Sequence, residues 1–421
     1  MSERRGLHTS LGILGLAAWL LFILGCTGWP SWSPDGTKIL APYVDPNAKQ
    51  EGIALYDLKA RTVRSIFLRP SAGQTDDGRY PAYAQWESDG KRAIVIWGGH
   101  EGDSLEVTLL PIGSGWPARH FSLRNRKRDT PLLPLPELNG FLFVGGKQIS
   151  MLNLRTGENL STPLKREVNP KTGERVAYQE VPQSGETLKE LEPQVYLHSD
   201  GSRILYDRGL EEEDALEIGT LDANDLSLHP LFRVPIADLK ARGLEDPMPG
   251  TFVTPEPRGA LLAIHVGSKN GDSILLCSQD GLESILQPDF GLSGVRMGLP
   301  QWAPGGKLLY VPAAAVVKEG VAQYWVAEVP IAGGRVRLTP IARFKAEEGD
   351  WDASFRLSLQ VSLSPDGSTL ATTTAGLSEK MMAPETKRAL YLVNLRDPKR
   401  TVTSIPAPLS SVSVKTAKEQ K

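Results

Sequence analysis

Aspartate–glycine pairs are the side-chain pattern that recurs most regularly in this sequence and that could do chemistry. Four of them lie within one repeated phrase, at Asp35–Gly36, Asp89–Gly90, Asp200–Gly201 and Asp366–Gly367. A carboxylate at such a position could act as a general acid or base, or bind a cation. A catalytic group is needed once in a chain, whereas this pair is repeated. We therefore interpret these aspartates as residues of a repeated turn.

Histidines and clustered acids give weak signals of a catalytic or metal site. No two histidines stand in a His-x-His or His-x-x-x-His pair; they are His8, His100, His120, His198, His229 and His265. The acidic runs Asp76–Asp77 and Glu211–Glu213 are typical of solvated loops. The segment His100–Asp103 is typical of a surface turn, although its oxygen ligands would suit calcium. We predict no catalytic residue, no metal ligand and no cofactor.

Motifs for other chemistry are missing from the sequence. It has no Gly-x-Ser-x-Gly elbow, no P-loop and no dinucleotide-binding glycine pattern after a strand. The net charge of -2 offers little to attract nucleic acid, and the one basic run is Arg124–Arg128. The sequence therefore predicts no nucleic-acid partner and argues against a peptidase, an NTPase or a dehydrogenase.

The composition indicates a large folded chain with many turns and few helices. The 421 residues are 40% hydrophobic and include 41 glycines and 32 prolines. Such a chain can bury a sizeable core, and its glycines and prolines favour turns. With two cysteines, Cys26 and Cys277, no disulfide framework holds the fold. Cys277 lies in an apolar run, so we expect it to be a small buried hydrophobic residue.

The N-terminus has the order of a targeting segment. Arg4 and Arg5 precede the apolar run Leu11–Leu24, which is shorter than the roughly 20 residues that a membrane-spanning helix needs. The run ends at Ile23-Leu24-Gly25-Cys26, which resembles the lipobox of bacterial lipoproteins. The resemblance implies that residues 1–26 are a signal peptide and that Cys26 is lipidated. The alternative is an uncleaved anchor helix over residues 7–26.

Both alternatives place the rest of the chain outside the cytoplasm and tether it to a membrane. In bacterial lipoproteins, an aspartate after the cysteine favours retention at the inner membrane. Here the residue is Thr27. We therefore expect the outer membrane or the cell surface rather than the inner membrane.

A longer phrase surrounds each aspartate–glycine pair and explains why the pair recurs. In the first copy, Trp32–Gly36, proline fixes φ, aspartate accepts local N–H groups and glycine takes a left-handed conformation. Degenerate copies fill the longer gaps, so that seven turns follow at intervals of about 50 to 60 residues. The further turn residues are Asn139, Gly140, Gly259, Gly305 and Gly306.

Strands are expected on both sides of each turn. Trp32, Trp86 and Trp302 each precede a turn and are expected to pack between neighbouring sheets as core. The aliphatic run after each turn and a second hairpin give four antiparallel strands per repeat. This pattern predicts an all-β protein, a seven-bladed β-propeller over residues 27–408, with six or eight blades as alternatives. Residues 409–421 are expected to be a polar tail.

The phrase Trp32–Gly36, followed by the strand Ile53–Leu58, resembles the WD40-like, or PD40, repeat. That repeat builds the propellers of TolB, of prolyl-oligopeptidase-type enzymes and of many secreted bacterial proteins. The resemblance covers about residues 29–407 and implies the same propeller fold here.

Two places depart from a regular array. The charged segment 165–193 either carries an extra hairpin at 175–181 or is a mobile loop. Each repeat is contiguous in sequence, so no strand is shared between the termini. We therefore expect the seam between the first and last repeats to rely on side-chain packing.

Two functions from different classes fit the sequence. The first is a membrane-tethered, extracytoplasmic propeller that binds an envelope protein, peptide or glycan, or acts as a scaffold. The second is an envelope hydrolase or lyase that acts on a polysaccharide or lactone at the mouth of the propeller channel. The fold does not decide between them, because one fold hosts many functions.

Overall fold

The computed structural model describes most residues between Pro30 and Pro408. The described ranges are 30–45, 47–48, 50–70, 83–87, 89–98, 104–113, 118–124, 132–135, 140–145, 148–153, 159–163, 166–168, 175–177, 194–197, 204–210, 214–221, 228–269, 271–346, 360–375, 383 and 386–408. The expected signal segment 1–26, with Cys26, and the tail 409–421 lie outside these ranges. So do the turn residues Asn139, Asp200 and Gly201.

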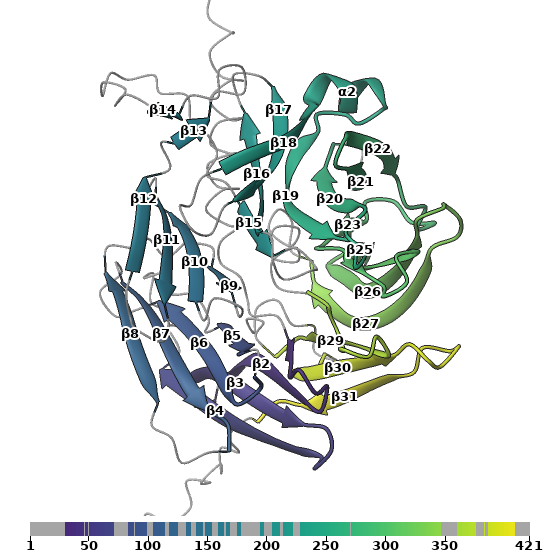
Figure 1. The fold of residues 1–421 in the computed structure, drawn as a ribbon. Helices are drawn as coiled ribbons and strands as arrows, with labels where there is room; N and C mark the ends of the chain where they lie inside the picture. The colour runs from purple at the N-terminus through teal and green to yellow at the C-terminus, as the bar shows by residue number, and fades with distance from the viewer. Residues whose placement is uncertain are drawn as a thin grey trace, which may run out of the picture. The chain divides into compact units, whose positions relative to one another are not determined.

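The described chain divides into two compact units. Its strands form sheets in which almost all neighbouring strands are antiparallel (Figure 1). Within the described ranges, unit 1 holds residues 125–341, and unit 2 holds residues 25–124 and 342–421.

Unit 2 contains three sheets of four strands, each in chain order. Sheet 1 comprises β1 (Ser31–Trp32), β2 (Lys38–Asp45), β3 (Gln50–Asp57) and β4 (Thr62–Pro70). Sheet 2 comprises β5 (Tyr83–Trp86), β6 (Arg92–Gly98), β7 (Ser104–Pro111) and β8 (Arg119–Arg124). Sheet 7 comprises β28 (Ser362–Leu363), β29 (Thr369–Thr373), β30 (Ala389–Asn394) and β31 (Val402–Pro406).

Unit 1 contains sheets 3 to 6. Sheet 3 comprises β9 (Leu132–Leu135), β10 (Gly140–Gly145), β11 (Gln148–Asn153) and β12 (Asn159–Pro163). Sheet 4 comprises β15 (Gln194–Leu197), β16 (Ile204–Leu210), β17 (Ala215–Leu221) and β18 (Leu228–Pro235), with β13 (Arg166–Val168) and β14 (Arg175–Ala177) added beside β18. Sheet 5 comprises β19 (Met248–Pro255), β20 (Leu262–Gly267), β21 (Ser273–Ser278) and β22 (Gly281–Leu286). In sheet 6 the first-strand position is divided between β23 (Arg296–Met297) and β24 (Gln301–Trp302), followed by β25 (Leu308–Lys318), β26 (Val321–Pro330) and β27 (Arg337–Lys345).

Each four-stranded sheet has two ends, which we name by what they carry. The turn end holds the turn between the first and second strands and the turn between the third and fourth. The loop end holds the connection between the second and third strands and the connection to the next sheet. Because successive strands are antiparallel, these connections alternate strictly between the two ends.

The turn between the first and second strands has one hydrogen-bond pattern in the five copies that the structure describes. In sheet 1, Gly36 N–H donates to Ser33 O at 2.8 Å and Ser33 N–H donates to Lys38 O at 2.9 Å. A glycine with φ between +67° and +73° ends each turn: Gly36, Gly90, Gly259, Gly306 and Gly367. A side chain at such a φ is strained, which is why the sequence repeats glycine there.

A further hydrogen bond joins the two turns of a sheet. The N–H of the residue after the third strand donates to the carbonyl of the residue that follows the turn glycine. The pairs are Leu58 to Thr37, Ile112 to Lys91, Ile331 to Lys307 and Leu395 to Ser368, at 2.8 to 3.1 Å. The turn end is therefore held by its own backbone.

In unit 2, the two faces of sheet 1 pack against different neighbours. Ile39 and Tyr56 share a buried cluster with Leu390 of sheet 7. Leu40 shares another cluster with Trp86 of sheet 2. Successive strand residues point to opposite faces, so Ile39 packs in the interface with sheet 7 and Leu40 in the interface with sheet 2.

The interface between sheets 1 and 7 joins the start of the described chain to its end. Trp32 Nε1–H donates to Ser362 O at 3.0 Å, and Val44 N–H donates to Ala375 O at 2.8 Å. The expectation that this seam relies on side-chain packing is therefore incomplete. Trp32, expected in the core, is half-buried and packs against the shared cluster rather than inside it.

The other two repeat tryptophans are buried and make the same contact as Trp32. Trp86 Nε1–H donates to Ser31 O of sheet 1 at 2.9 Å. Trp302 Nε1–H donates to Thr254 O of sheet 5 at 2.7 Å within unit 1. Each indole thus bonds to the first strand of the preceding sheet, or, for Trp32, to that of sheet 7.

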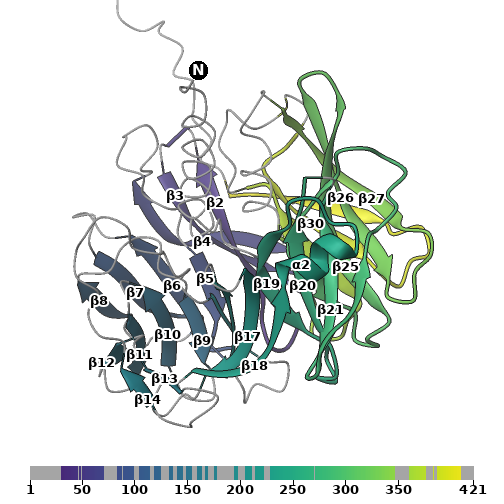
Figure 2. The same ribbon diagram turned by 90° about the horizontal axis from the view of Figure 1, so that it is seen from above.

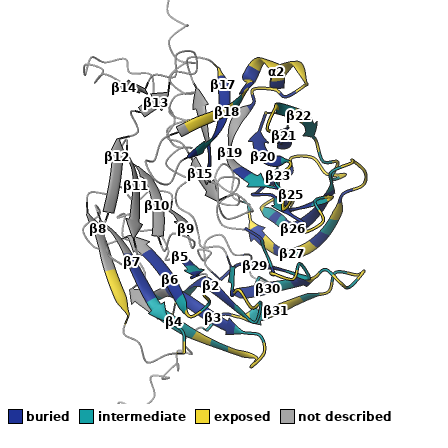
Figure 3. Cartoon of the chain, viewed as in Figure 1, coloured by how far each residue is buried: buried dark blue, intermediate teal, exposed yellow. Residues whose placement is uncertain are grey.

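The core of unit 1 lies between sheets 4 and 5 and between sheets 5 and 6. Buried residues line β20, β21, β25 and β26, whereas α2 (Ile236–Ala241) is half exposed (Figure 3). Ile236 and Leu239 of α2 join the cluster that contains Ile264 of β20. Seen from above, α2 lies over strands of sheet 5 (Figure 2). This helix, which has a little less than two turns, was not predicted from the sequence.

Two strand predictions are corrected in unit 1. The extra hairpin is formed by β13 and β14, so it starts at Arg166 rather than Arg175. The sequence also predicts a strand over the aliphatic run Leu308–Val311, and β25 is longer, because Ala313–Ala315 continue it although alanine has little preference for strands. Burial of these alanines on the sheet 6 core decides their conformation.

Among the described residues, no helix has the length and apolar character that crossing a membrane requires.

Candidate functional site

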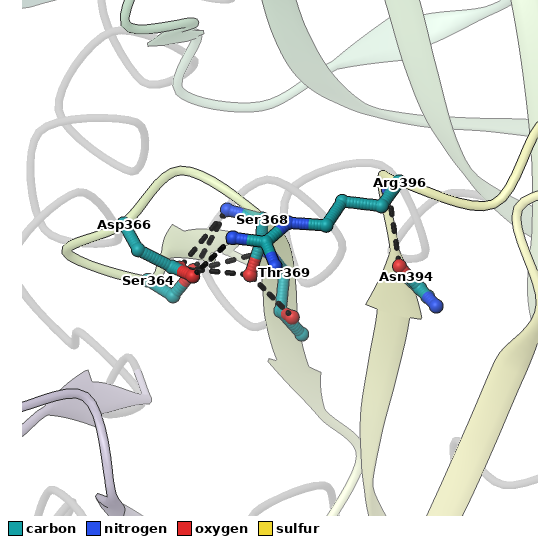
Figure 4. A network of polar contacts seen from close by, with 6 residues as sticks. All are labelled: Ser364, Asp366, Ser368, Thr369, Asn394 and Arg396. Carbon is teal, nitrogen blue, oxygen red and sulfur yellow. Dashed lines mark hydrogen bonds and ion pairs between the residues drawn. The ribbon is translucent and has the colours of Figure 1, made fainter.

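The turn aspartates lie in closed local networks. Asp366 Oδ1 accepts hydrogen bonds from Ser364 Oγ at 2.7 Å and from Ser368 Oγ at 2.8 Å (Figure 4). Arg396 Nη2 lies 2.9 Å from Oδ2. The Ser364 hydrogen bond, with those from Ser368, lowers the pKa of Asp366 to about 2.

The first copy of the turn repeats this arrangement. Asp35 Oδ1 accepts hydrogen bonds from Ser33 Oγ at 2.6 Å and from Thr37 N–H at 3.0 Å. The Ser33 hydrogen bond, followed by that from Thr37 N–H, lowers the pKa of Asp35 to about 2. In sheet 2, Asp89 Oδ1 accepts from Lys91 N–H at 2.9 Å. These carboxylates shape turns, and those of Asp35 and Asp366 are held ionised.

The remaining sequence-derived positions are dispersed. Gly140 is the first residue of β10 and pairs with Leu135 and Asn153. Gly305 stands before Gly306 in the sheet 6 turn. Cys277 is a free, buried residue of β21, and burial raises the pKa of its thiol to about 12. Within the described ranges, no three His, Cys, Asp or Glu side chains gather as metal ligands.

The described histidines occupy separate strands. His120 Nδ1 lies 2.8 Å from Thr108 Oγ1 in sheet 2, and His229 lies on β18. His265 lies on β20 and is only 4% exposed. His8, His100 and His198 fall outside the described residues. His265 has a neighbouring carboxylate.

Asp272 is that carboxylate, and it connects three segments at the loop end of sheets 5 and 6. Its side chain is fully buried. Oδ2 accepts a hydrogen bond from Met297 N–H at 2.7 Å and lies 3.3 Å from His265 Nε2. Oδ1 accepts from Arg296 Nη1 at 3.3 Å. We call His265, Asp272, Arg296 and Met297 the loop-end cluster.

The connection before Asp272 is a tight turn. Ser268 N–H donates to Gly271 O at 3.1 Å, and Ser268 Oγ also donates to that carbonyl. Lys269 N–H donates to Glu245 O, just after α2, at 2.7 Å. The turn is thus attached to the α2 segment on one side and, through Asp272, to β23 on the other.

The connection between sheets 5 and 6 carries an exposed apolar side chain. Asp289 Oδ1 accepts from Gly291 N–H at 2.8 Å, and Gly291 and Gly294 both have φ of +65°. Leu292, between these glycines, is 46% exposed. The segment therefore has a defined backbone and still presents a leucine to solvent.

The loop-end cluster is suited to positioning rather than to proton transfer with solvent. His265 Nε2 is buried and has no hydrogen-bond partner. Asp272 is occupied by an N–H group and a guanidinium, which ionised carboxylates accept well. Sequence reasoning considered His265 and missed Asp272, Arg296 and Met297, because only folding brings these residues together.

Comparison with known proteins identifies the fold. No family model and no curated protein matches the chain. The β-propeller domain of Cps50 (Swd1) from Myceliophteria thermophila is 14% identical with a TM-score of 0.52, over 88% of this chain and 97% of that chain. An oligogalacturonate lyase in complex with manganese is 12% identical (TM-score 0.48, 88% and 85% covered). TolB from Acinetobacter baumannii is 14% identical (TM-score 0.42, 89% and 82% covered).

At such identities a structural likeness concerns the fold and not the activity. The match to the Cps50 (Swd1) domain spans nearly all of both chains. The described strands and the single short helix agree with it. This chain is an all-β protein with the β-propeller fold, which confirms that part of the fold prediction, while the number of blades and the N-terminal signal or anchor helix stay predictions.

Proposed function

We propose that this chain is a membrane-tethered, extracytoplasmic β-propeller that binds a partner and does not catalyse a reaction. The seven sheets of the described residues would be its seven blades. The lipobox-like sequence at Cys26 would provide a lipid anchor, at the outer membrane or the cell surface. The partner would be an envelope protein, peptide or glycan.

The loop-end cluster is the observation that carries the binding role. A buried carboxylate fixes the 268–272 turn and the start of sheet 6, while Leu292 stays exposed on the segment between sheets 5 and 6. Binding surfaces need such support, because a preformed loop loses less entropy on binding. At the turn end, backbone N–H and carbonyl groups of the turns already bond to one another.

Crosslinking and pull-down of the full acylated chain from its envelope test this proposal. We expect one specific partner with the parent chain and a several-fold lower yield with Asp272→Asn. Asp246→Asn, at an exposed position after α2, is the control and keeps the parent yield. Recovery of no specific partner, together with turnover of a polysaccharide or lactone panel, would overturn the proposal.

The second candidate is an envelope hydrolase or lyase. The 3.3 Å approach of His265 Nε2 to Asp272 is the specific observation in its favour, since a histidine beside a carboxylate can act as a general base. The burial of His265 weighs against this role. Its test is the same panel with the parent and His265→Gln. A reaction lost in His265→Gln while the melting temperature is kept would favour the enzyme.

A further inference from the structure

We propose that the outer edge of β31, the last strand of sheet 7, is a docking site for an extended peptide segment of a partner protein. The segment adds to the sheet as a fifth strand and is recognised mainly through its backbone. The inference goes beyond the proposed function, because it concerns unit 2 and depends neither on the loop-end cluster nor on a lipid anchor.

The hydrogen bonds between β30 and β31 show which backbone groups of β31 face its partner strand. At one end, Asn394 N–H donates to Thr401 O at 3.0 Å, and at the other end Ala407 N–H donates to Arg388 O at 3.1 Å. In an antiparallel pair, bonded and non-bonded residues alternate. Every second residue from 401 to 407 therefore bonds to β30.

The residues between them present their backbone groups outward. Val402 and Ser404 each present an N–H and a carbonyl, and Pro406 presents a carbonyl. Among the described strands, none lies beside β31 opposite β30. A row of outward donors and acceptors on an edge strand is what an added strand pairs with.

β31 lacks the features that usually keep an edge strand from pairing. Natural proteins place charged side chains or internal prolines on exposed edges. β31 reads Val-Thr-Ser-Ile-Pro, with no charge and with its proline as the last residue. Several outer strands of this chain do carry such features: Arg64 on β4, Glu283 on β22, and Arg337 and Pro340 on β27. The edge of β31 is thus open by comparison.

Sheet 4 shows that an outer strand of this chain accepts an added strand. β13 lies beside β18, the fourth strand of that sheet, and pairs with it through Glu167 and Leu228. β14 pairs with β13 in turn, so this sheet has six strands. β31 is the fourth strand of sheet 7 and has the equivalent position. The architecture therefore has room for a further strand there.

The side chains of β31 indicate an uncharged, β-branched partner segment. Val402 and Ile405 are half-buried, and Thr403 and Ser404 are exposed. Ile405 packs against the apolar cluster between sheets 1 and 7. Arg400, just before the strand, donates to two carbonyls of its own turn. Threonine and valine suit such a pleated, half-buried surface.

The size of the edge favours a peptide over a second copy of this chain. A stable interface between two folded proteins buries about 800 Å² on each partner, which a five-residue edge alone does not supply. A bound peptide instead obtains its affinity from main-chain hydrogen bonds along one strand. The partner is therefore a protein that offers an unpaired, extended segment.

Binding of a synthetic peptide to the full-length chain tests the proposal. The probe is a fluorescent peptide of three Thr-Val repeats, N-methylated at its threonines so that it pairs through one edge only. The control peptide is N-methylated at every residue and should not bind. Ser404→Pro removes an outward N–H and leaves the bonds to β30 in place. We expect it to bind the probe about tenfold more weakly, whereas Ser404→Ala, which keeps that N–H, should bind like the parent.

Amide hydrogen exchange, measured by NMR with the same probe, gives a readout for each residue. The peptide should slow exchange at Val402 and Ser404 and leave Thr403 and Ile405 unchanged, because the latter two already bond to β30. If Ser404→Pro lowers the melting temperature, Val402→Lys takes its place. That variant keeps every backbone donor, adds a charge at the edge and should weaken binding by a similar factor.

Equal binding of the probe by Ser404→Pro and Ser404→Ala overturns the proposal, and so does no binding by the parent chain. A parent chain that sediments as a dimer without peptide, and as a monomer when Ser404 is replaced by proline, also overturns it. The occupant of the edge would then be a second copy of this chain.

Discussion

At the scale of single residues, the turn aspartates link the stability of the propeller to pH. Asp35 and Asp366 each have a pKa of about 2, well below the usual range of an aspartate. Both are held by neighbouring hydroxyl and N–H donors in a turn that begins a hairpin. Their contribution therefore depends on the ionised form of the carboxylate.

The first prediction follows from the sign of that shift. A carboxyl whose pKa is lower in the folded state stabilises the fold above its unfolded pKa, and the gain is lost as the pH falls toward the folded pKa. We expect stability to fall between about pH 4 and pH 2. Denaturant melts of Asp35→Asn and Asp366→Asn should show a smaller fall than the parent. Asp280→Asn, in the exposed turn of sheet 5, should retain the full dependence.

The second prediction separates backbone strain from crowding at a turn glycine. Gly306 and Gly320 have φ of +67° and +70°. A Cβ on Gly306 would collide with the buried Glu256 side chain, whereas a Cβ on Gly320 would meet nothing within 4 Å. Gly320→Ala should cost about 1 kcal/mol, and Gly306→Ala clearly more. Equal losses in urea unfolding would show that Glu256 moves aside freely.

At the scale of elements, the repeated tryptophan packs with apolar residues between sheets and also forms a hydrogen bond from one sheet to the next. Its indole N–H bonds to a backbone carbonyl of another sheet in all three copies, at 2.7 to 3.0 Å. A tryptophan can satisfy a buried polar group and fill space at once. This dual use explains why tryptophan suits the position in these three copies, whereas Leu363 stands there in sheet 7.

The third prediction tests the connector at the seam. Trp32→Phe keeps most of the ring volume but removes the hydrogen bond to Ser362 O. A lost hydrogen bond of this type costs about 0.5–1.5 kcal/mol. Hydrogen exchange should accelerate in β1 and β28 of unit 2. Unchanged exchange would mean that packing and the Val44–Ala375 bond suffice.

The turns could be predicted from sequence because their chemistry is local. Proline, aspartate and glycine in succession determine φ and the nearby hydrogen bonds whatever surrounds them. The sequence indicates the pair β25 and β26 but not the length of these strands. Ala313–Ala315 belong to β25 because they are buried, and not because alanine favours strands. The loop-end cluster could not be predicted at all, since His265, Asp272 and Arg296 meet only when sheets 5 and 6 are side by side. The lipidation of Cys26, the envelope location and the partner stay predictions.

At the scale of the whole molecule, the first and last sheets of the described chain are built in the same way as other sheets. Sheets 1 and 7 each contain four strands in chain order, and no strand is exchanged between them. Their interface in unit 2 uses an indole hydrogen bond and shared apolar residues, as other neighbouring sheets do. The interface would therefore form equally well if a linker joined the two ends of the described chain.

The seam therefore makes the protein a candidate for circular permutation. A linker of about ten residues, somewhat longer than the usual connection of about four to six, would join Pro408 to Pro30, and new termini would open between Gly291 and Leu292. Because every sheet would stay contiguous, we expect the permuted chain to fold, with a melting temperature near that of the parent. A permutant that fails to fold would show that the order of synthesis, and not only the set of interfaces, directs assembly. For this protein, the place where the gene starts would then be separable from the place where the fold begins.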